Sequence, residues 1–198
     1  MFSALASDHS DLQDKINVFV SLSPMLKLNN SPNKFFKKIS DDWWTIWGVS
    51  QFFHLWELKE HEENYTVHNF CGMFGWFCNQ LNNFIGSKFS KYNNQSACEL
   101  ESTRDGQSSS LKSIIHFSQN FRDGVFRQFD YGNAELNEEH YGSKTVPALP
   151  LENIRVPVAM FVGTKDEISN THDTREVYDY IKTSFFYQVY PNYDHFSW

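Results

Sequence analysis

The stretch from residue 156 to residue 191 constrains the fold most, because a helix pattern lies between two strand patterns. "VPVAMFVG" (156–163) and "SFFYQVYP" (184–191) are short runs of apolar, β-branched and aromatic residues, as in buried strands. Between them, "THDTREVYDYIKT" (171–183) has the pattern of a helix opened by a capping residue. Two strands joined through a helix in this way form a parallel pair. The sequence therefore predicts an α/β fold.

The rest of the chain divides into two further zones. Residues 1–23 begin with apolar positions at roughly helical spacing and continue into "INVFVSLS" (16–23), which reads as a buried strand. Residues 24–145 are aromatic-rich, and five of the six tryptophans lie between Trp43 and Trp76. Residues 146–198 return to the α/β pattern. We expect core segments at 1–23 and 146–198, separated by a mainly helical insertion at 24–145.

Helices are expected in the insertion at three places. Residues 41–63 should start at Asp41 or Asp42 as N-cap and carry a mixed stripe that includes Trp47 and His54. Residues 67–85 form a weaker helix pattern, since glycines interrupt it. The third pattern covers residues 110–124, with Ser109 or Ser110 as N-cap and a glycine after its end.

Composition and charge exclude some functional classes. The net charge of −7 gives no basic footprint for nucleic acid. No apolar run approaches the roughly 20 residues of a membrane span. The first residues have no basic start, and Asp8 and Asp11 interrupt them, so we expect no signal peptide in this chain. We expect no cofactor and no metal site. The three cysteines do not have the pattern of a zinc cluster.

Asp166 and His195 are the candidate acid and base. Each follows a predicted strand, and sites in open α/β sheets form at the carboxyl ends of strands. An aspartate can fix the tautomer of an imidazole that deprotonates a serine, and α/β-hydrolases carry these groups in the chain order Ser, Asp or Glu, His. The alternative is structural: a strand-end aspartate can simply cap a turn, and a histidine among aromatics can simply pack.

Several ordered segments resemble the acid lipases, the α/β-hydrolases that include lysosomal acid lipase and gastric lipase. "INVFVSLSP" resembles the strand after the family's nucleophile helix. "FDYG" (129–132), Asn137 and "HY" (140–141) match a family stretch of the form F-D-[WY]-G, N, H-Y. "VPVAMFVGTKDEIS" and "PNYDHFSW" resemble the segments with the catalytic aspartate and histidine. The match spans nearly the whole chain, although the aromatic middle matches loosely.

The resemblance implies a partial α/β-hydrolase core with a mostly parallel sheet and a large helical cap. It also implies an ester hydrolase of neutral lipids, either triacylglycerols or sterol esters, in which Asp166 and His195 serve the catalytic serine. The aromatic stripe of the cap would be cap core, an acyl-chain surface, or both. The expected partners are a lipid ester and a lipid surface met by the cap, and the expected compartment is lysosomal or extracellular.

The family's nucleophile motif is missing. No G-x-S-x-G occurs in the sequence, and "MFSALASDHSDL" resembles the body of the helix that follows this motif. We therefore expect the nucleophile and the oxyanion-hole donors to lie outside the chain, which alone would be an inactive fragment. Ser108, Ser109 and Ser110 are better explained by helix capping than as nucleophiles. The alternative is a non-catalytic lipid-binding or interaction module from a truncated gene.

Three further expectations concern the cap. The resemblance implies a disulfide between Cys71 and Cys78, which requires a helix break near the intervening glycines; the alternative is two buried thiols. Asn64 and Asn94 head N-x-[ST] sequons and are possible glycosylation sites. Glu57 and His61 share a helix face, but H-E-x-x-H is not completed, so a solvated face is expected there.

Overall fold

Three parallel strands form the centre of the fold. The structure is a computed structural model that describes residues 1–7, 10–54, 90, 92 and 110–198. The strands are β1 (Phe19–Leu22), β2 (Val158–Gly163) and β3 (Ser184–Tyr190), in the order β1-β2-β3. Both pairings are parallel, as the sequence predicts for β2 and β3. All three strands are shorter than predicted: β1 by four residues, β2 by two and β3 by one.

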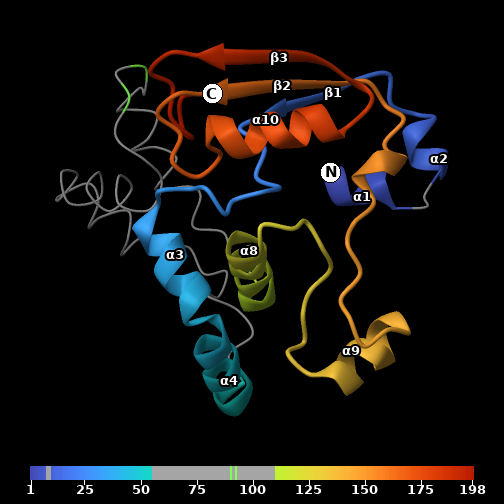
Figure 1. The fold of residues 1–198 in the computed structure, drawn as a ribbon, viewed down its shortest axis with the longest axis vertical. Helices are drawn as coiled ribbons and strands as arrows, with labels where there is room; N and C mark the ends of the chain where they lie inside the picture. The colour runs from blue at the N-terminus through green and yellow to red at the C-terminus, as the bar shows by residue number, and fades with distance from the viewer. Residues whose placement is uncertain (8–9, 55–89, 91, 93–109) are drawn as a thin grey trace, which may run out of the picture.

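Helix α10 (Thr171–Tyr180) connects β2 to β3 and lies against one face of the sheet (Figure 1). The side chain of Asn170 caps it by accepting hydrogen bonds from the backbone N–H groups of His172 and Asp173. Val177 on this helix packs with Val158 and Met160 of β2 in the main hydrophobic core. The helix ends three residues before the predicted limit.

The start of the chain contains two short helices instead of a continuous one. Helix α1 (Phe2–Ala6) packs on η1 (Leu151–Asn153), a single 3₁₀ turn before β2, and helix α2 (Ser10–Gln13) follows. The side chain of Gln13 donates to the backbone oxygens of Leu5 and Asn153 and accepts from the N–H of Arg155. These bonds tie the two short helices to the segment that enters β2.

The insertion contributes α3 (Lys34–Asp41), α4 (Trp43–Phe53), α8 (Leu111–Asp123) and α9 (Ala134–Tyr141), which lie below the sheet layer in Figure 1. The helix predicted over 41–63 begins where expected, with Asp42 at the N-cap position of α4, but it ends at Phe53. His54 adopts a left-handed conformation that ends α4, and α3 precedes it as a separate helix. Asp42 and Ser110 occupy N-cap positions, but neither side chain makes a capping hydrogen bond.

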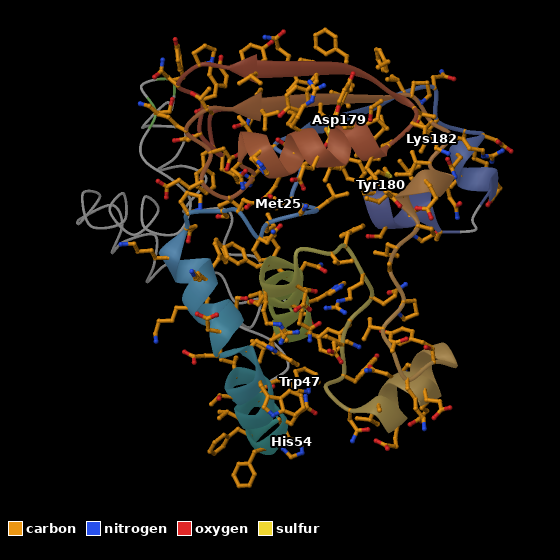
Figure 2. The ribbon with its side chains drawn as sticks, viewed as in Figure 1. Met25, Trp47, His54, Asp179, Tyr180 and Lys182 are labelled. Atoms are coloured by element: carbon orange, nitrogen blue, oxygen red, sulfur yellow. The ribbon has the colours of Figure 1, made fainter. Side chains whose placement is uncertain are left out.

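Figure 2 shows Trp47 on α4 and His54 directly after its end, far from the sheet, whereas Tyr180 and Lys182 lie at the end of α10 beside the sheet. The two layers meet where Leu28, Phe121 and Ile168 form a small buried cluster. Leu28 belongs to the segment after β1, Phe121 to α8, and Ile168 to the loop after β2. The helical layer is therefore anchored close to the end of the strand that carries Asp166.

A cluster of ion pairs lies at the carboxyl end of α8. The Nε of Arg122 donates to Oδ1 of Asp123 at 2.6 Å, and Arg127 also contacts this carboxylate. Burial by itself would raise the pKa of Asp123, but the hydrogen bond from Arg122 and the charge of Arg127 outweigh it, so the pKa lies below its ordinary value. The next residue, Gly124, has a φ of +63° and ends the helix, as the sequence predicts.

In the described part of the chain, helices cover only one face of the sheet. On the other face, Val20 and Leu22 of β1 are each 51% exposed, and Phe186 of β3 is 42% exposed. Parallel sheets are normally covered on both faces.

None of the helices that the structure describes has the length and apolar character needed to cross a bilayer.

Candidate active site at the strand ends

The loops after β2 and β3 are bonded to each other through their backbones. The N–H of Thr164 donates to the carbonyl of Tyr190 at 3.1 Å, and the N–H of Lys165 donates to the carbonyl of Tyr193 at 2.9 Å. Gly163 at the end of β2 makes this approach possible, because a Cβ there would lie 2.2 Å from the carbonyl oxygen of Tyr193. The two loops therefore form one unit at the carboxyl edge of the sheet.

Asp166 and His195 meet in this unit. The Nδ1 of His195 lies 2.9 Å from Oδ2 of Asp166, and the other carboxylate oxygen accepts from the backbone N–H groups of Ile168 at 2.9 Å and Ser169 at 2.8 Å. The Asp166 side chain is fully buried, whereas the imidazole is 19% exposed. The carboxylate is thus fixed by the backbone on one side, while the imidazole reaches solvent. A carboxylate at Nδ1 favours the tautomer that leaves Nε2 as a proton acceptor.

Asp194 holds the turn that presents His195, and the sequence analysis missed it. Its carboxylate accepts from the N–H of Phe196 at 3.0 Å, the hydroxyl of Ser197 at 2.8 Å and the N–H of Ser90 at 3.0 Å. The side chain of Ser90 in turn donates to the backbone oxygen of Asn192 at 2.5 Å. Asp194 is 1% exposed, so a buried charge here joins the insertion to the turn around His195. The only local sequence signal for this role of Asp194 is that a short polar residue directly precedes the histidine.

Aromatic rings pack around the same turn. Tyr190, Tyr193 and Trp198 are mutually in contact, with ring centroids 5.1–5.5 Å apart. Tyr92 of the insertion joins this group through Tyr193 at 4.9 Å. The terminal run of aromatics therefore packs as the structural alternative supposed, and it does so beside a histidine that makes a specific polar contact.

A second polar cluster lies on α10. His172, Asp173 and Glu176 have ligand atoms within 4.8 Å of one another. Asp173 is buried and accepts hydrogen bonds from the side-chain amides of Asn30 and Asn170, each at 2.6 Å. Glu176 is paired with the ammonium group of Lys27, whose hydrogen bond holds the pKa of Glu176 below its ordinary value. The carboxylates of Asp173 and Glu176 thus already accept hydrogen bonds from other side chains of the protein.

Several expected features of the insertion lie outside the described residues. They are the disulfide pair Cys71 and Cys78, the sequons at Asn64 and Asn94, the pair Glu57 and His61, the serines Ser108 and Ser109, and the helix pattern over 67–85. The described Ser110 stands at the N-cap position of α8.

A parallel sheet with an aspartate and a histidine in contact at its carboxyl edge is the arrangement of a partial α/β-hydrolase core. Among solved structures, the chain is similar to MGS-M2, an alpha/beta hydrolase enzyme from a deep-sea metagenome library. That match has 13% identity and a TM-score of 0.39, over 98% of this chain and 55% of the other. A likeness this weak adds nothing on function.

The curated relatives of the chain are named as lipases. Lipase member K of Mus musculus is 26% identical over 196 residues, which cover 96% of this chain and 48% of the relative. Lysosomal acid lipase/cholesteryl ester hydrolase of Rattus norvegicus is 22% identical over 200 residues, 97% of this chain and 49% of the relative. No family model matches. The chain thus resembles the acid lipases over most of its length, and it spans about half the length of these relatives.

Proposed function

We propose that the chain is part of a serine carboxylic-ester hydrolase that acts on neutral lipids. The observation that carries the proposal is the contact between Asp166 and His195 at 2.9 Å, with the second carboxylate oxygen held by two backbone N–H groups. The relatives support it, since they are named as lipases and as an acid lipase/cholesteryl ester hydrolase. The name of the rat relative supports a lysosomal location, and an extracellular location is the alternative within this proposal.

In this mechanism, Asp166 keeps the proton on Nδ1 of His195, so that Nε2 accepts the proton of a serine hydroxyl. The serine oxygen attacks the ester carbonyl, and the imidazolium then protonates the leaving alcohol. Water enters with the same histidine as base and releases the carboxylic acid. No G-x-S-x-G occurs among the 198 residues, so the proposal takes the serine from a polypeptide segment outside them.

The helical insertion is proposed to meet the lipid. On α4, Val49, Phe52 and Phe53 follow one another at helical spacing on the same side, and their exposed fractions are 47%, 77% and 63%. Large exposed aromatic side chains beside one another favour contact with an apolar surface. The division into core segments at 1–23 and 146–198 and a cap at 24–145 belongs to the same proposal.

The test is a chimera in which residues 1–198 replace the matched half of mouse lipase member K. We expect the folded chimera to react with a fluorophosphonate probe and to hydrolyse a neutral lipid ester. His195→Gln and Asp166→Asn should each lower hydrolysis by about a thousandfold or more. His172→Gln and Asp179→Asn provide matched controls on the exposed face of α10 and should change it less than threefold.

The 198-residue chain alone should not react with the probe at any serine. Labelling of a single serine in the isolated chain would show that the nucleophile lies within it. A folded chimera that binds lipid but neither reacts nor hydrolyses, or one in which the His195 and His172 variants behave alike, would favour the non-catalytic lipid-binding module instead.

A further inference from the structure

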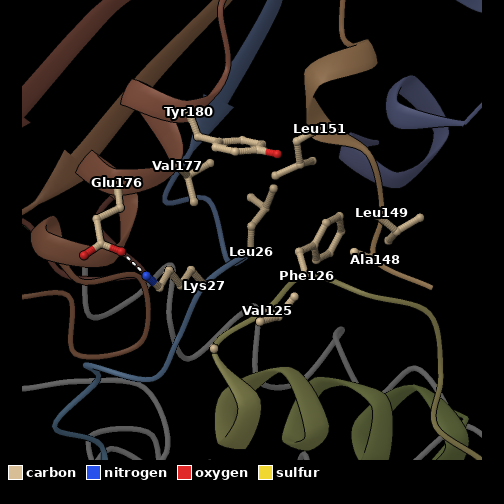
Figure 3. A pocket seen from close by; sticks show the side chains of 11 residues that line it. Leu26, Lys27, Val125, Phe126, Ala148, Leu149, Leu151, Glu176, Val177 and Tyr180 are labelled. Atoms are coloured by element: carbon tan, nitrogen blue, oxygen red, sulfur yellow. Dashed lines mark hydrogen bonds and ion pairs between the residues drawn. The ribbon is translucent and has the colours of Figure 1, made fainter. Parts of the chain in front are cut away.

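An apolar cavity lies between α10 and the segment that follows α8, and no lining residue comes from the Asp166–His195 site. Its volume is about 410 Å³, within the range typical of small-molecule sites. Figure 3 shows Leu26, Leu151 and Val177 pointing into it from three different segments. These three side chains are 3–6% exposed, so they form a buried floor.

The wall of the cavity is also apolar, and its rim is mostly so. Phe126 lines one wall, and the backbone N–H of Leu149 donates to the carbonyl of Phe126 at 2.9 Å, which fixes the two segments beside each other. Val125 and Tyr180 stand at the rim, with exposed fractions of 48% and 57%. An aliphatic chain that entered here would bury apolar surface on several sides, which is favourable at about 25 cal/mol per Å².

One end of the cavity is polar. There the ammonium group of Lys27 pairs with Glu176, and Figure 3 marks this contact. The side chains are 30% and 42% exposed, so a bound molecule can still reach both. The hydrogen bond from Lys27 holds the pKa of Glu176 below its ordinary value, so the carboxylate stays an acceptor in weakly acidic solution. An ammonium offers three donors, and one carboxylate occupies only part of them.

We propose that this cavity binds an uncharged aliphatic alcohol, with the chain on the apolar floor and the hydroxyl at the Lys27–Glu176 pair. A hydroxyl is both donor and acceptor, so it accepts from Lys27 and donates to Glu176 without breaking the pair. A carboxylate or ammonium head would gain one attraction and meet one repulsion at this neutral pair, which leaves the cost of desolvating its charge uncompensated. The polar end therefore selects an alcohol over a fatty acid or an amine of the same length.

The inference does not depend on the proposed ester hydrolysis, since it requires only the folded chain. The experiment titrates residues 1–198 with 1-decanol and, separately, with decanoate at pH 7 by isothermal titration calorimetry. We expect 1-decanol to bind at least about tenfold more tightly, because the uncompensated desolvation of a carboxylate at a partly exposed site amounts to about that factor. Equal or tighter binding of decanoate would overturn the proposal.

Two variants locate the binding. Val125→Trp places an indole at the rim and should weaken 1-decanol binding by about tenfold, because it occupies space that the chain would use. Val18→Trp is the matched control, since Val18 is 46% exposed, comparable to Val125 at 48%, and does not line the cavity. If the two tryptophan variants bind 1-decanol equally, the alcohol binds elsewhere and the proposal is wrong.

Glu176→Gln tests the polar end. The glutamine keeps an acceptor oxygen but loses the charge, so 1-decanol affinity should change less than about threefold, whereas decanoate affinity should rise by about tenfold. Lys27→Met removes the donor and should weaken 1-decanol binding by about tenfold. If neither variant changes the ratio between the two ligands, the head group does not lie at the Lys27–Glu176 pair, and that part of the proposal fails.

Discussion

Replacing Asp166 by asparagine should reverse the tautomer of His195 while leaving the loop after β2 folded. In the structure, Oδ1 accepts from the N–H groups of Ile168 and Ser169, and Oδ2 accepts from Nδ1 of His195. An asparagine satisfies both backbone donors only if its oxygen occupies the Oδ1 position. Its NH₂ group then faces Nδ1, which has to become an acceptor, so the proton moves to Nε2. An imidazole protonated at Nε2 cannot take a proton from a serine.

The stability cost separates two substitutions at this position. In Asp166→Asn, bonds to a charged acceptor become bonds to a neutral one, which we expect to lower the free energy of unfolding by about 1–3 kcal/mol. In Asp166→Ala, two buried backbone N–H groups lose their acceptor as well, and the cost rises to about 3–6 kcal/mol. We therefore expect the tautomer change in Asp166→Asn and the larger loss of unfolding free energy in Asp166→Ala.

The assay uses ¹⁵N-labelled chain 1–198. Two- and three-bond ¹H–¹⁵N correlation spectra at a pH where the imidazole is neutral report which nitrogen carries the proton, and His195→Gln assigns the signal. Urea denaturation of the wild type and both variants gives the stabilities. The reasoning fails if His195 keeps its proton on Nδ1 in Asp166→Asn, or if the asparagine and alanine variants unfold at the same urea concentration.

Three further substitutions have defined outcomes. Asp194→Ala removes an acceptor from the backbone N–H of Ser90, so hydrogen exchange of that amide should accelerate by about tenfold or more, and unchanged exchange would contradict the contact. The pKa of Asp123 lies below its ordinary 3.8, although burial alone would raise it, because its two arginine partners outweigh burial. The ionised Asp123 therefore stabilises the fold fully above pH 3.8, and this stabilisation is lost as the pH falls through the lower pKa of the folded state. Urea denaturation at a series of decreasing pH values should show the difference in unfolding free energy between the wild type and Asp123→Asn becoming smaller. A difference that grows as the pH falls would refute this reasoning. Gly163→Ala places a Cβ 2.2 Å from a backbone oxygen of the turn after β3 and should cost about 1–3 kcal/mol by thermal unfolding, whereas Gly48→Ala, with nothing within 4 Å, should cost nothing.

The strand–helix–strand unit could be predicted from the sequence because its signals are local. The apolar runs of β2 and β3 are short and flanked by turn residues, and the helix between them begins at Asn170, whose side chain caps it. The parallel pairing then follows from the connection alone. Asp166 and His195 each follow one of these strands, so their meeting at one edge of the sheet is also a consequence of local pattern and topology.

Other parts of the fold depend on contacts that local pattern does not contain. The helix expected over 41–63 ends early because His54 takes a left-handed conformation, which aromatic periodicity does not reveal. Gly163 looks like an ordinary strand end, and its importance comes from a backbone oxygen 30 residues later in the sequence, at Tyr193. Asp194 could not be distinguished from any turn aspartate, because its partner Ser90 lies 104 residues away. Long-range polar contacts of this kind decide where the histidine points.

The position of His195 is determined from three directions. Asp166 holds the imidazole through Nδ1, the loop after β2 holds the preceding turn through the carbonyl of Tyr193, and the insertion holds it through Ser90 and Asp194. A catalytic base requires such restraint, since a misplacement of about 1 Å can cost a hundredfold in rate. The contact with Ser90 is the only one of the three that comes from the lipid-facing insertion proposed above. In that proposal, a movement of the insertion that withdrew Ser90 would leave a buried carboxylate short of a donor one residue before the histidine. The insertion and the base would then not move independently, so the orientation of the imidazole would depend on the position of the lipid-binding layer.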